Sequence, residues 1–300
     1  MNIGELLGGG FRVLAKRPKE LIIWSIIQLV FGGAVFAIMM PFFASIMAAQ
    51  RAAAAGTAPA LPSGLGMIFL FELLLMLWFL MLFAAVVRMT ASDGNDRWAW
   101  LRFGMDEIRL IGLGLLLIIA MIVVEIVAVL LGGVVVGLVT AGSAAAGGIL
   151  AVVLIILGIC AAIWASVRIS LIAAITVLDH EFAIRKGWRA TKGHFWTLFG
   201  TYVVMFIGYM IVEGIAVAVM SPFLFSSLVG ARSPDQAIEA QQRMMATLTT
   251  PSVGLIIFWV VGSLVGTALI AYYHAVNATA AIAATGHSRA DLAGLESAFE

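Results

Sequence analysis

The chain has 300 residues, of which 63% are hydrophobic and 11% charged, with a formal net charge of +1 and a mean hydropathy of +1.12. Soluble domains carry about 25% charged residues, so a chain this apolar cannot cover a water-facing surface. The composition excludes an ordinary soluble protein and indicates that lipid forms much of its surroundings. The single cysteine, Cys160, excludes an intrachain disulfide or a cysteine metal cluster, and its apolar neighbours favour a packing role.

Six apolar runs are long enough to cross a membrane, which takes about 20 mainly apolar residues. The first is longer than the core of a cleavable signal sequence, so we interpret it as a retained helix. Backbone groups in lipid must be hydrogen-bonded within the segment, which favours helices. The predicted fold is therefore an all-α polytopic bundle with six transmembrane helices. In chain order the runs are 21–47, 64–87, 110–139, 148–167, 195–225 and 252–276, and a continuation of the fourth to residue 178 stays open.

Basic residues are distributed unevenly between the two sides of these six runs. The segments on the side of the termini carry 14 of the lysines and arginines, and those on the opposite side carry 3. Because basic residues are retained on the cytoplasmic side, both termini are predicted to be cytoplasmic. In the last outer loop, Ser233 followed by Pro234 predicts the start of a short surface helix.

Three parts of the sequence resemble one another, which indicates an internal repeat. The third and fifth runs align without gaps and place Glu125 opposite Glu213. The segment 7–12 before the first run matches the segment 184–189 before the fifth. The second, fourth and sixth runs end in similar patterns, namely Val87-Arg88-Met-Thr90, Val167-Arg168-Ile-Ser170 and Val276-Asn277-Ala-Thr279.

The repeat predicts three tandem hairpins in one orientation, at approximately 1–91, 92–180 and 181–285, followed by a short cytoplasmic tail at 286–300. Each hairpin would hold a short amphipathic cytoplasmic helix, a helix that crosses outward and a helix that returns. Together they form a single integral membrane domain over 1–300.

Charged residues inside the apolar runs form a candidate intramembrane polar site. At 1.5 Å per residue, each of the three glutamates lies roughly 22–24 Å from the inner end of its run, in the outer half of the membrane. Charges at this depth are costly and usually functional, so we expect these carboxylates to face the bundle. They either lock the hairpins together by hydrogen bonds or act as a proton relay, an ion site or a lipid contact. The candidate residues are Glu72, Glu125, Glu213 and Arg168.

The position of Arg168 depends on where the fourth run ends. If the helix ends at Val167, the arginine is an interfacial anchor. If the helix continues to Leu178, the arginine lies near the midplane and needs a partner. Its match to Arg88 in the repeat favours the first interpretation.

Aromatic and basic residues mix in the segments that precede the outgoing helices. Aromatic rings prefer headgroup depth, and cations meet anionic lipid there, at about 1 kcal/mol for each basic residue. These residues are either ordinary interfacial anchors or a specific site for anionic headgroups. The candidate headgroup-binding residues are Arg12, Lys16, Arg102, Trp188, Arg189 and Lys192.

Sequence signatures of catalysis are missing. His180-Glu181 begins like a zinc-protease motif, but Ile184 stands where the second histidine belongs. The sequence has no P-loop and no Gly-x-Ser-x-Gly elbow, and its four histidines do not cluster by spacing. We therefore predict no catalytic residue, no metal and no cofactor, and we do not expect an enzyme.

Two stretches carry a family resemblance. One runs from Arg168-Ile-Ser through Gly187-Trp188-Arg189 to Trp196, and the other is Trp100-Leu-Arg-Phe-Gly104-Met-Asp106-Glu107. Both resemble uncharacterised bacterial six-helix inner-membrane proteins that are related to the membrane region of some glycerophosphodiester phosphodiesterases. The resemblance implies a bacterial inner-membrane location and a connection to lipid. The soluble phosphodiesterase domain and its acidic and histidine catalytic set have no counterpart in this sequence.

Two functional hypotheses follow. The first is a non-catalytic inner-membrane protein that binds lipid or a protein partner and supports envelope homeostasis. The alternative is a transporter or channel, proton-linked through the buried glutamates. The expected partners are membrane lipids, with anionic lipids as one candidate, and not nucleic acid, and the sequence identifies no protein partner.

Overall fold

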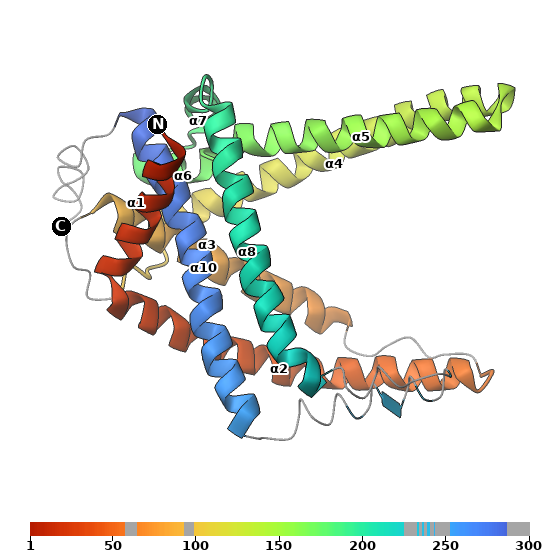
Figure 1. Ribbon diagram of the computed structural model, residues 1–300, viewed down its shortest axis with the longest axis horizontal. Coiled ribbons are helices and arrows are strands. Elements are labelled where there is room, and N and C mark those ends of the chain that lie inside the picture. Colours follow the sequence, from red (N-terminus) through yellow and green to blue (C-terminus); the bar gives the residue numbers. More distant parts are fainter. Residues whose placement is uncertain are drawn as a thin grey trace. The chain divides into compact units, whose positions relative to one another are not determined.

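The computed structural model describes residues 1–57, 65–92, 99–224, 233, 236, 239, 240, 243 and 253–286. All the regular secondary structure in these residues is helical (Figure 1). The helices are α1 (Ile3–Lys16), α2 (Pro18–Ala54), α3 (Leu65–Ala91), α4 (Met105–Gly142), α5 (Ala144–Ile169), α6 (Ile172–Asp179), α7 (Ile184–Ala190), α8 (Phe195–Leu224) and α10 (Val253–Thr285).

Six of the spans are long and apolar enough to cross a membrane, which confirms the six predicted runs. They are α2, α3, α4, α5 continued by α6, α8 and α10. Most helices extend beyond the apolar run that predicted them, because a helix needs no apolar residues once it has left the lipid. For example, α4 begins at Met105, five residues before the expected start of its run.

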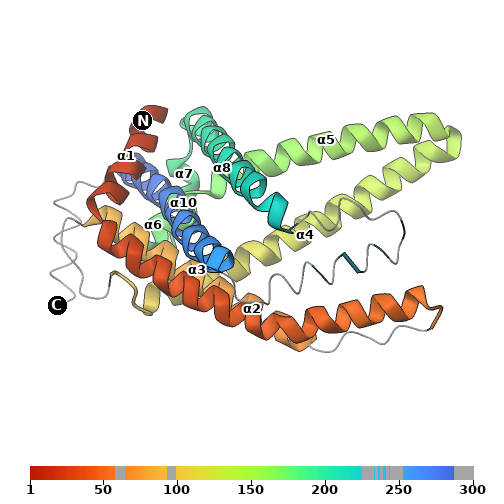
Figure 2. The same cartoon turned by 60° about the horizontal axis from the view of Figure 1, so that its bottom comes forward.

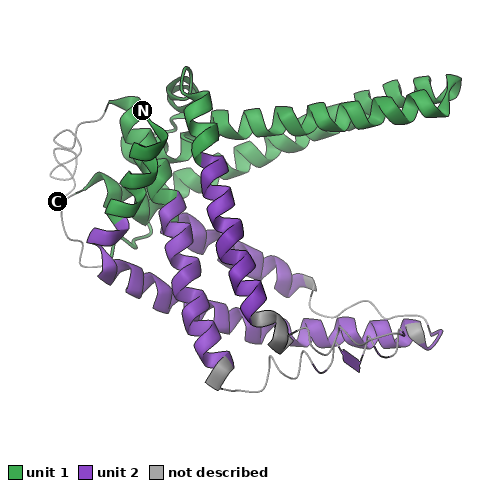
Figure 3. Cartoon of the chain, in the orientation of Figure 1, with its two compact units in different colours: residues 1–13, 83–201, 274–300 green, residues 14–82, 202–273 purple. Residues whose placement is uncertain are grey.

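The chain divides into two compact units, which Figure 3 colours separately. Unit 1 contains residues 1–13, 83–201 and 274–300, and unit 2 contains residues 14–82 and 202–273. Helices α1, α3, α8 and α10 each contribute residues to both units. These boundaries do not coincide with the predicted hairpin boundaries, and the threefold repeat stays a prediction.

In unit 2, polar groups on apolar helices are satisfied by neighbouring helices. The Trp78 indole N–H on α3 donates a hydrogen bond to the side-chain oxygen of Gln28 on α2. The Ser263 hydroxyl on α10 donates to the Ser25 carbonyl oxygen of α2 at 2.6 Å. Because a polar group in an apolar medium is costly without a partner, these bonds specify how the helices of this unit pair.

In unit 1, α4 and α5 form a long hairpin whose helices lie side by side in Figures 1 and 2. Only Ser143 separates them, and its hydroxyl caps α5 by accepting a hydrogen bond from the Ala146 N–H at 3.3 Å. At the same turn, Gly147 lies against Thr140 so closely that a side chain would collide with it. The uncharged loop expected at 140–147 is therefore a one-residue turn.

The short helices α6 and α7 complete this unit. The apolar side of α6 is buried, and α6 packs against α4 and α7. The approach of α7 depends on Gly187, since a Cβ atom there would lie 2.7 Å from Ile172 Cα. Sequence reasoning left open whether the fourth run continues to residue 178 and did not predict α6 as a separate helix, because the apolar sequence resumes directly after Arg168 and Ser170.

Several expectations about local structure need correction. The amphipathic helices predicted before the first and third hairpins exist as α1 and α7, but residues 99–104 before the second hairpin are not helical. There Ala99 and Trp100 adopt positive φ angles of 52° and 63°, and both are buried. Cys160 was expected to pack internally, yet it is exposed on α5.

The outer surface helix predicted at Ser233 falls almost wholly outside the described residues. A hydrogen bond from the Gln236 N–H to the Ser233 hydroxyl oxygen, at 3.3 Å, fits the predicted N-terminal cap.

Candidate functional site

Two arginines lie in the last turns of long apolar helices, Arg88 in α3 and Arg168 in α5. The α5 helix ends at Ile169, and a turn separates it from α6. Arg168 therefore lies at the end of α5, while the apolar span continues through α6 to Asp179, so the depth of Arg168 in the membrane stays a prediction. Both arginines belong to unit 1, and their surroundings differ in charge.

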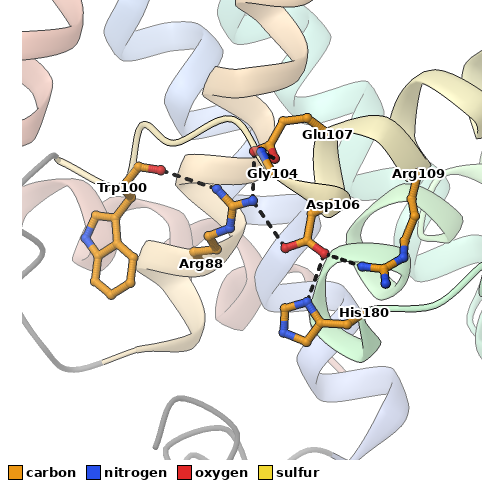
Figure 4. Close-up of polar contacts among 7 residues, drawn as sticks. All are labelled: Arg88, Trp100, Gly104, Asp106, Glu107, Arg109 and His180. Atoms are coloured by element: carbon orange, nitrogen blue, oxygen red, sulfur yellow. Dashed lines mark hydrogen bonds and ion pairs between the residues drawn. The ribbon is translucent and has the colours of Figure 1, made fainter. Parts of the chain in front are cut away.

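Arg88 lies in a network of acidic groups (Figure 4). Its Nη2 atom is 2.7 Å from the Glu107 carboxylate and 3.2 Å from that of Asp106, and its Nη1 donates to the Trp100 carbonyl oxygen at 3.4 Å. The Glu107 side chain is only 1% exposed, and it also accepts a hydrogen bond from the Gly104 N–H at 2.8 Å. The buried cation is therefore neutralised, and α3 is tied to the start of α4.

Asp106 joins a third element to the same network. One of its oxygens lies 2.9 Å from Arg109 Nη1 and 2.9 Å from His180 Nδ1 (Figure 4). His180 ends α6 in a left-handed conformation with φ of 54°. The network thus connects α3, α4 and α6 through charge-assisted hydrogen bonds, which are stronger than neutral ones.

Sequence reasoning did not identify this network as a site. The sequence does contain its charged residues, with Arg88 at the end of an apolar run and Asp106, Glu107 and Arg109 at the start of the next. A loop separates the two groups, and the sequence does not show that this loop brings them together. His180 lies 74 residues from Asp106, and only the folded chain brings them together.

Arg168 is surrounded by aromatic rings and a hydroxyl group. Its guanidinium carbon lies 4.8 Å from the centroid of the Trp188 ring and 5.9 Å from that of Trp164, within the range of cation–π interactions. Its Nη1 donates to the Thr191 hydroxyl oxygen at 3.1 Å. Within the part of the chain that the structure describes, Arg168 forms no ion pair, and its Nε atom is buried without a hydrogen-bond partner.

The segment from α7 to the start of α8 presents cations and indoles at the surface. Arg185, Arg189 and Lys192 are exposed, whereas Lys186 is paired with Asp179 at 2.5 Å. The Trp188 and Trp196 side chains are exposed to 38% and 77%. The structure therefore brings the predicted residues Trp188, Arg189 and Lys192 together with Arg168. The other predicted headgroup ligands, Arg12, Lys16 and Arg102, are exposed on other elements.

The three glutamates are divided between the two units. Glu125 belongs to unit 1, and Glu72 and Glu213 belong to unit 2. We expected these carboxylates to face the bundle, but Glu72 and Glu125 are exposed on their helices and Glu213 is partly exposed. None of them forms an ion pair with a described residue. The transporter hypothesis, which needs them around one hydrated cavity, stays a prediction.

The fold defines the class of this protein as a multi-pass α-helical membrane protein, because six of its spans are long and apolar enough to cross a bilayer. Comparisons with protein-family models, with curated proteins and with solved structures find no match to the chain. The resemblance to the membrane region of some glycerophosphodiester phosphodiesterases therefore stays a prediction. Over the described residues, no group of three or more histidine, cysteine or acidic side chains is arranged to hold a metal ion.

Proposed function

We propose that this protein is a non-catalytic membrane protein of the bacterial inner membrane that binds anionic phospholipid on the cytoplasmic side. The observation that carries the proposal is the exposed basic and aromatic surface formed by Arg185, Trp188, Arg189, Lys192 and Trp196. Exposed indoles prefer the headgroup region, and cations there attract anionic lipid.

The charges of this surface are free to act on a ligand. The neighbouring Lys186 is paired with Asp179, whereas no ion pair among the described residues involves Arg185, Arg189 or Lys192. At about 1 kcal/mol for each cation near an anionic surface, these three supply about 3 kcal/mol of attraction. The excess of basic residues on the same side of the predicted topology supports its assignment to the cytoplasmic face.

The test compares two triple variants in lipid nanodiscs with an increasing fraction of phosphatidylglycerol in phosphatidylcholine. The first removes the surface charges by Arg185→Gln, Arg189→Gln and Lys192→Gln. The matched control removes three charges from the opposite predicted face by Arg51→Gln, Arg232→Gln and Arg243→Gln. The measured quantity is the midpoint temperature of thermal unfolding.

We expect the midpoint of the wild type and of the control to rise with the anionic fraction, and the midpoint of the first variant to rise much less. High salt should weaken the rise, because the attraction is electrostatic and partly screened. Two results would contradict the proposal. In the first, the midpoints of the two triple variants rise equally with the anionic fraction. In the second, the wild-type midpoint does not change with the anionic fraction.

A further inference from the structure

Arg168 has hydrogen-bonding capacity that the protein does not use. A guanidinium group has five N–H donors, and the structure gives Arg168 one bond, from Nη1 to Thr191. Its Nε–H is buried without a partner in the described chain. A buried donor that lacks an acceptor is unfavourable, so an acceptor that bonded to this group would be stabilised.

The surroundings of Arg168 hold its guanidinium group in a fixed orientation. The Thr191 hydroxyl, which is fully buried, accepts from Arg168 Nη1 and donates to one of two carbonyl oxygens, those of Arg168 at 3.2 Å and Trp188 at 3.0 Å. The Trp164 and Trp188 rings pack edge-to-face with centroids 5.7 Å apart, and both lie against the guanidinium group. A preorganised group loses little entropy when a ligand binds.

The equivalent arginine shows what is missing at Arg168. Arg88 ends α3 as Arg168 ends α5, and two carboxylates of the chain neutralise it. Arg168 has aromatic rings in the place of those carboxylates, and the following segment adds the exposed cations Arg189 and Lys192. The chain therefore supplies the anion at one arginine and leaves it to a ligand at the other.

We propose that Arg168, Thr191, Trp164 and Trp188 form a specific site for the phosphate group of an anionic phospholipid. A planar guanidinium group binds two oxygens of a phosphate in parallel, and this geometry distinguishes it from a lysine ammonium. Lipid is the favoured source of the phosphate because both indoles are exposed, to 48% for Trp164 and 38% for Trp188, and Trp164 belongs to an apolar membrane span. This inference rests on the proposed function and names the residue that makes the contact.

The experiment measures retention of phosphatidic acid and phosphatidylglycerol by the full chain, using native mass spectrometry after release from nanodiscs. The decisive variant is Arg168→Lys, which keeps the charge but loses the planar fork. Arg185→Gln is the matched control, because it removes a charge from the same surface and leaves the site intact. Circular dichroism and the unfolding midpoint check that each variant folds.

The site predicts that Arg168→Lys lowers the affinity for anionic lipid about tenfold, because a charge-assisted bidentate contact is lost. Arg185→Gln should lower it about fivefold or less, which corresponds to one surface charge. If Arg168→Lys fails to fold, Trp188→Leu takes its place. Trp188 is 38% exposed and lies against the guanidinium group, so its loss should weaken lipid retention severalfold.

The outcomes separate this inference from the proposed function. A wild type that retains phosphatidylcholine as well as anionic lipid overturns both. A wild type that prefers anionic lipid, together with an Arg168→Lys variant that binds it equally well, overturns the specific site alone. Displacement of the retained lipid by millimolar inorganic phosphate would overturn the lipid assignment and make free phosphate the ligand.

Discussion

The strongest prediction concerns Glu107, whose side chain is the most deeply buried carboxylate of the Arg88 network. Glu107→Ala removes its bond to Arg88 at 2.7 Å and its bond to the Gly104 N–H at 2.8 Å. Removing one partner of a buried ion pair costs about 3–5 kcal/mol, and we take the lower end, about 3 kcal/mol, because Asp106 still pairs with Arg88. Loss of the cap at the start of α4 adds about 1 kcal/mol.

Equilibrium unfolding in mixed micelles of SDS and a mild detergent, followed by far-UV circular dichroism, measures this loss. The control is Glu239→Ala, because Glu239 is 61% exposed and pairs with Arg243 on the surface, where such pairs contribute about 0.3–0.5 kcal/mol. Glu107→Gln should fall between the two, since its amide oxygen still accepts from Gly104. A Glu107→Ala variant as stable as Glu239→Ala would refute the reasoning.

Two further predictions test the packing of α7 and the membrane assignment. Gly187→Ala should destabilise the protein by about 1–3 kcal/mol in the same unfolding assay, since the new Cβ would lie 2.7 Å from Ile172 Cα. The control is Gly208→Ala, which should be neutral or stabilising because its Cβ would have nothing within 4 Å. In sealed vesicles, a membrane-impermeant maleimide should not label Cys160, although the side chain is exposed in the isolated chain, because lipid covers it. A Cys160→Ser, Ala145→Cys variant should be labelled at the turn between α4 and α5, and labelling of both sites at equal rates would contradict the assignment.

The six membrane helices could be predicted because the bilayer imposes a simple rule, a minimum length of apolar sequence. The rule does not decide where a helix breaks inside a long apolar stretch. Arg168 and Ser170 lie at the turn between α5 and α6, but the apolar sequence resumes after them, so the rule left open whether the fourth run ends at Val167 or continues to Leu178. The rule also says nothing of which face of a helix is covered. We expected Glu125 to face the bundle because a charge in lipid is costly, and it is exposed on α4.

The candidate site was predictable in part. The mixture of aromatic and basic residues in 188–192 marked an interfacial surface, and the repeat placed Arg88 and Arg168 in equivalent positions. The difference between these two arginines depends on long-range contacts with Asp106, Glu107 and Thr191, which lie 18–23 residues along the chain. Periodicity and composition carry no information about such contacts.

The central claim is that this protein binds anionic phospholipid at the basic and aromatic surface that runs from α7 to the start of α8. The most direct measurement extracts the protein with its surrounding membrane into polymer-bounded discs and compares the lipids in the discs with the bulk membrane by mass spectrometry. The wild type should be enriched in anionic phospholipid, and the Arg185→Gln, Arg189→Gln, Lys192→Gln variant should approach the bulk composition. Discs of the wild type with the lipid composition of the bulk membrane would contradict the claim.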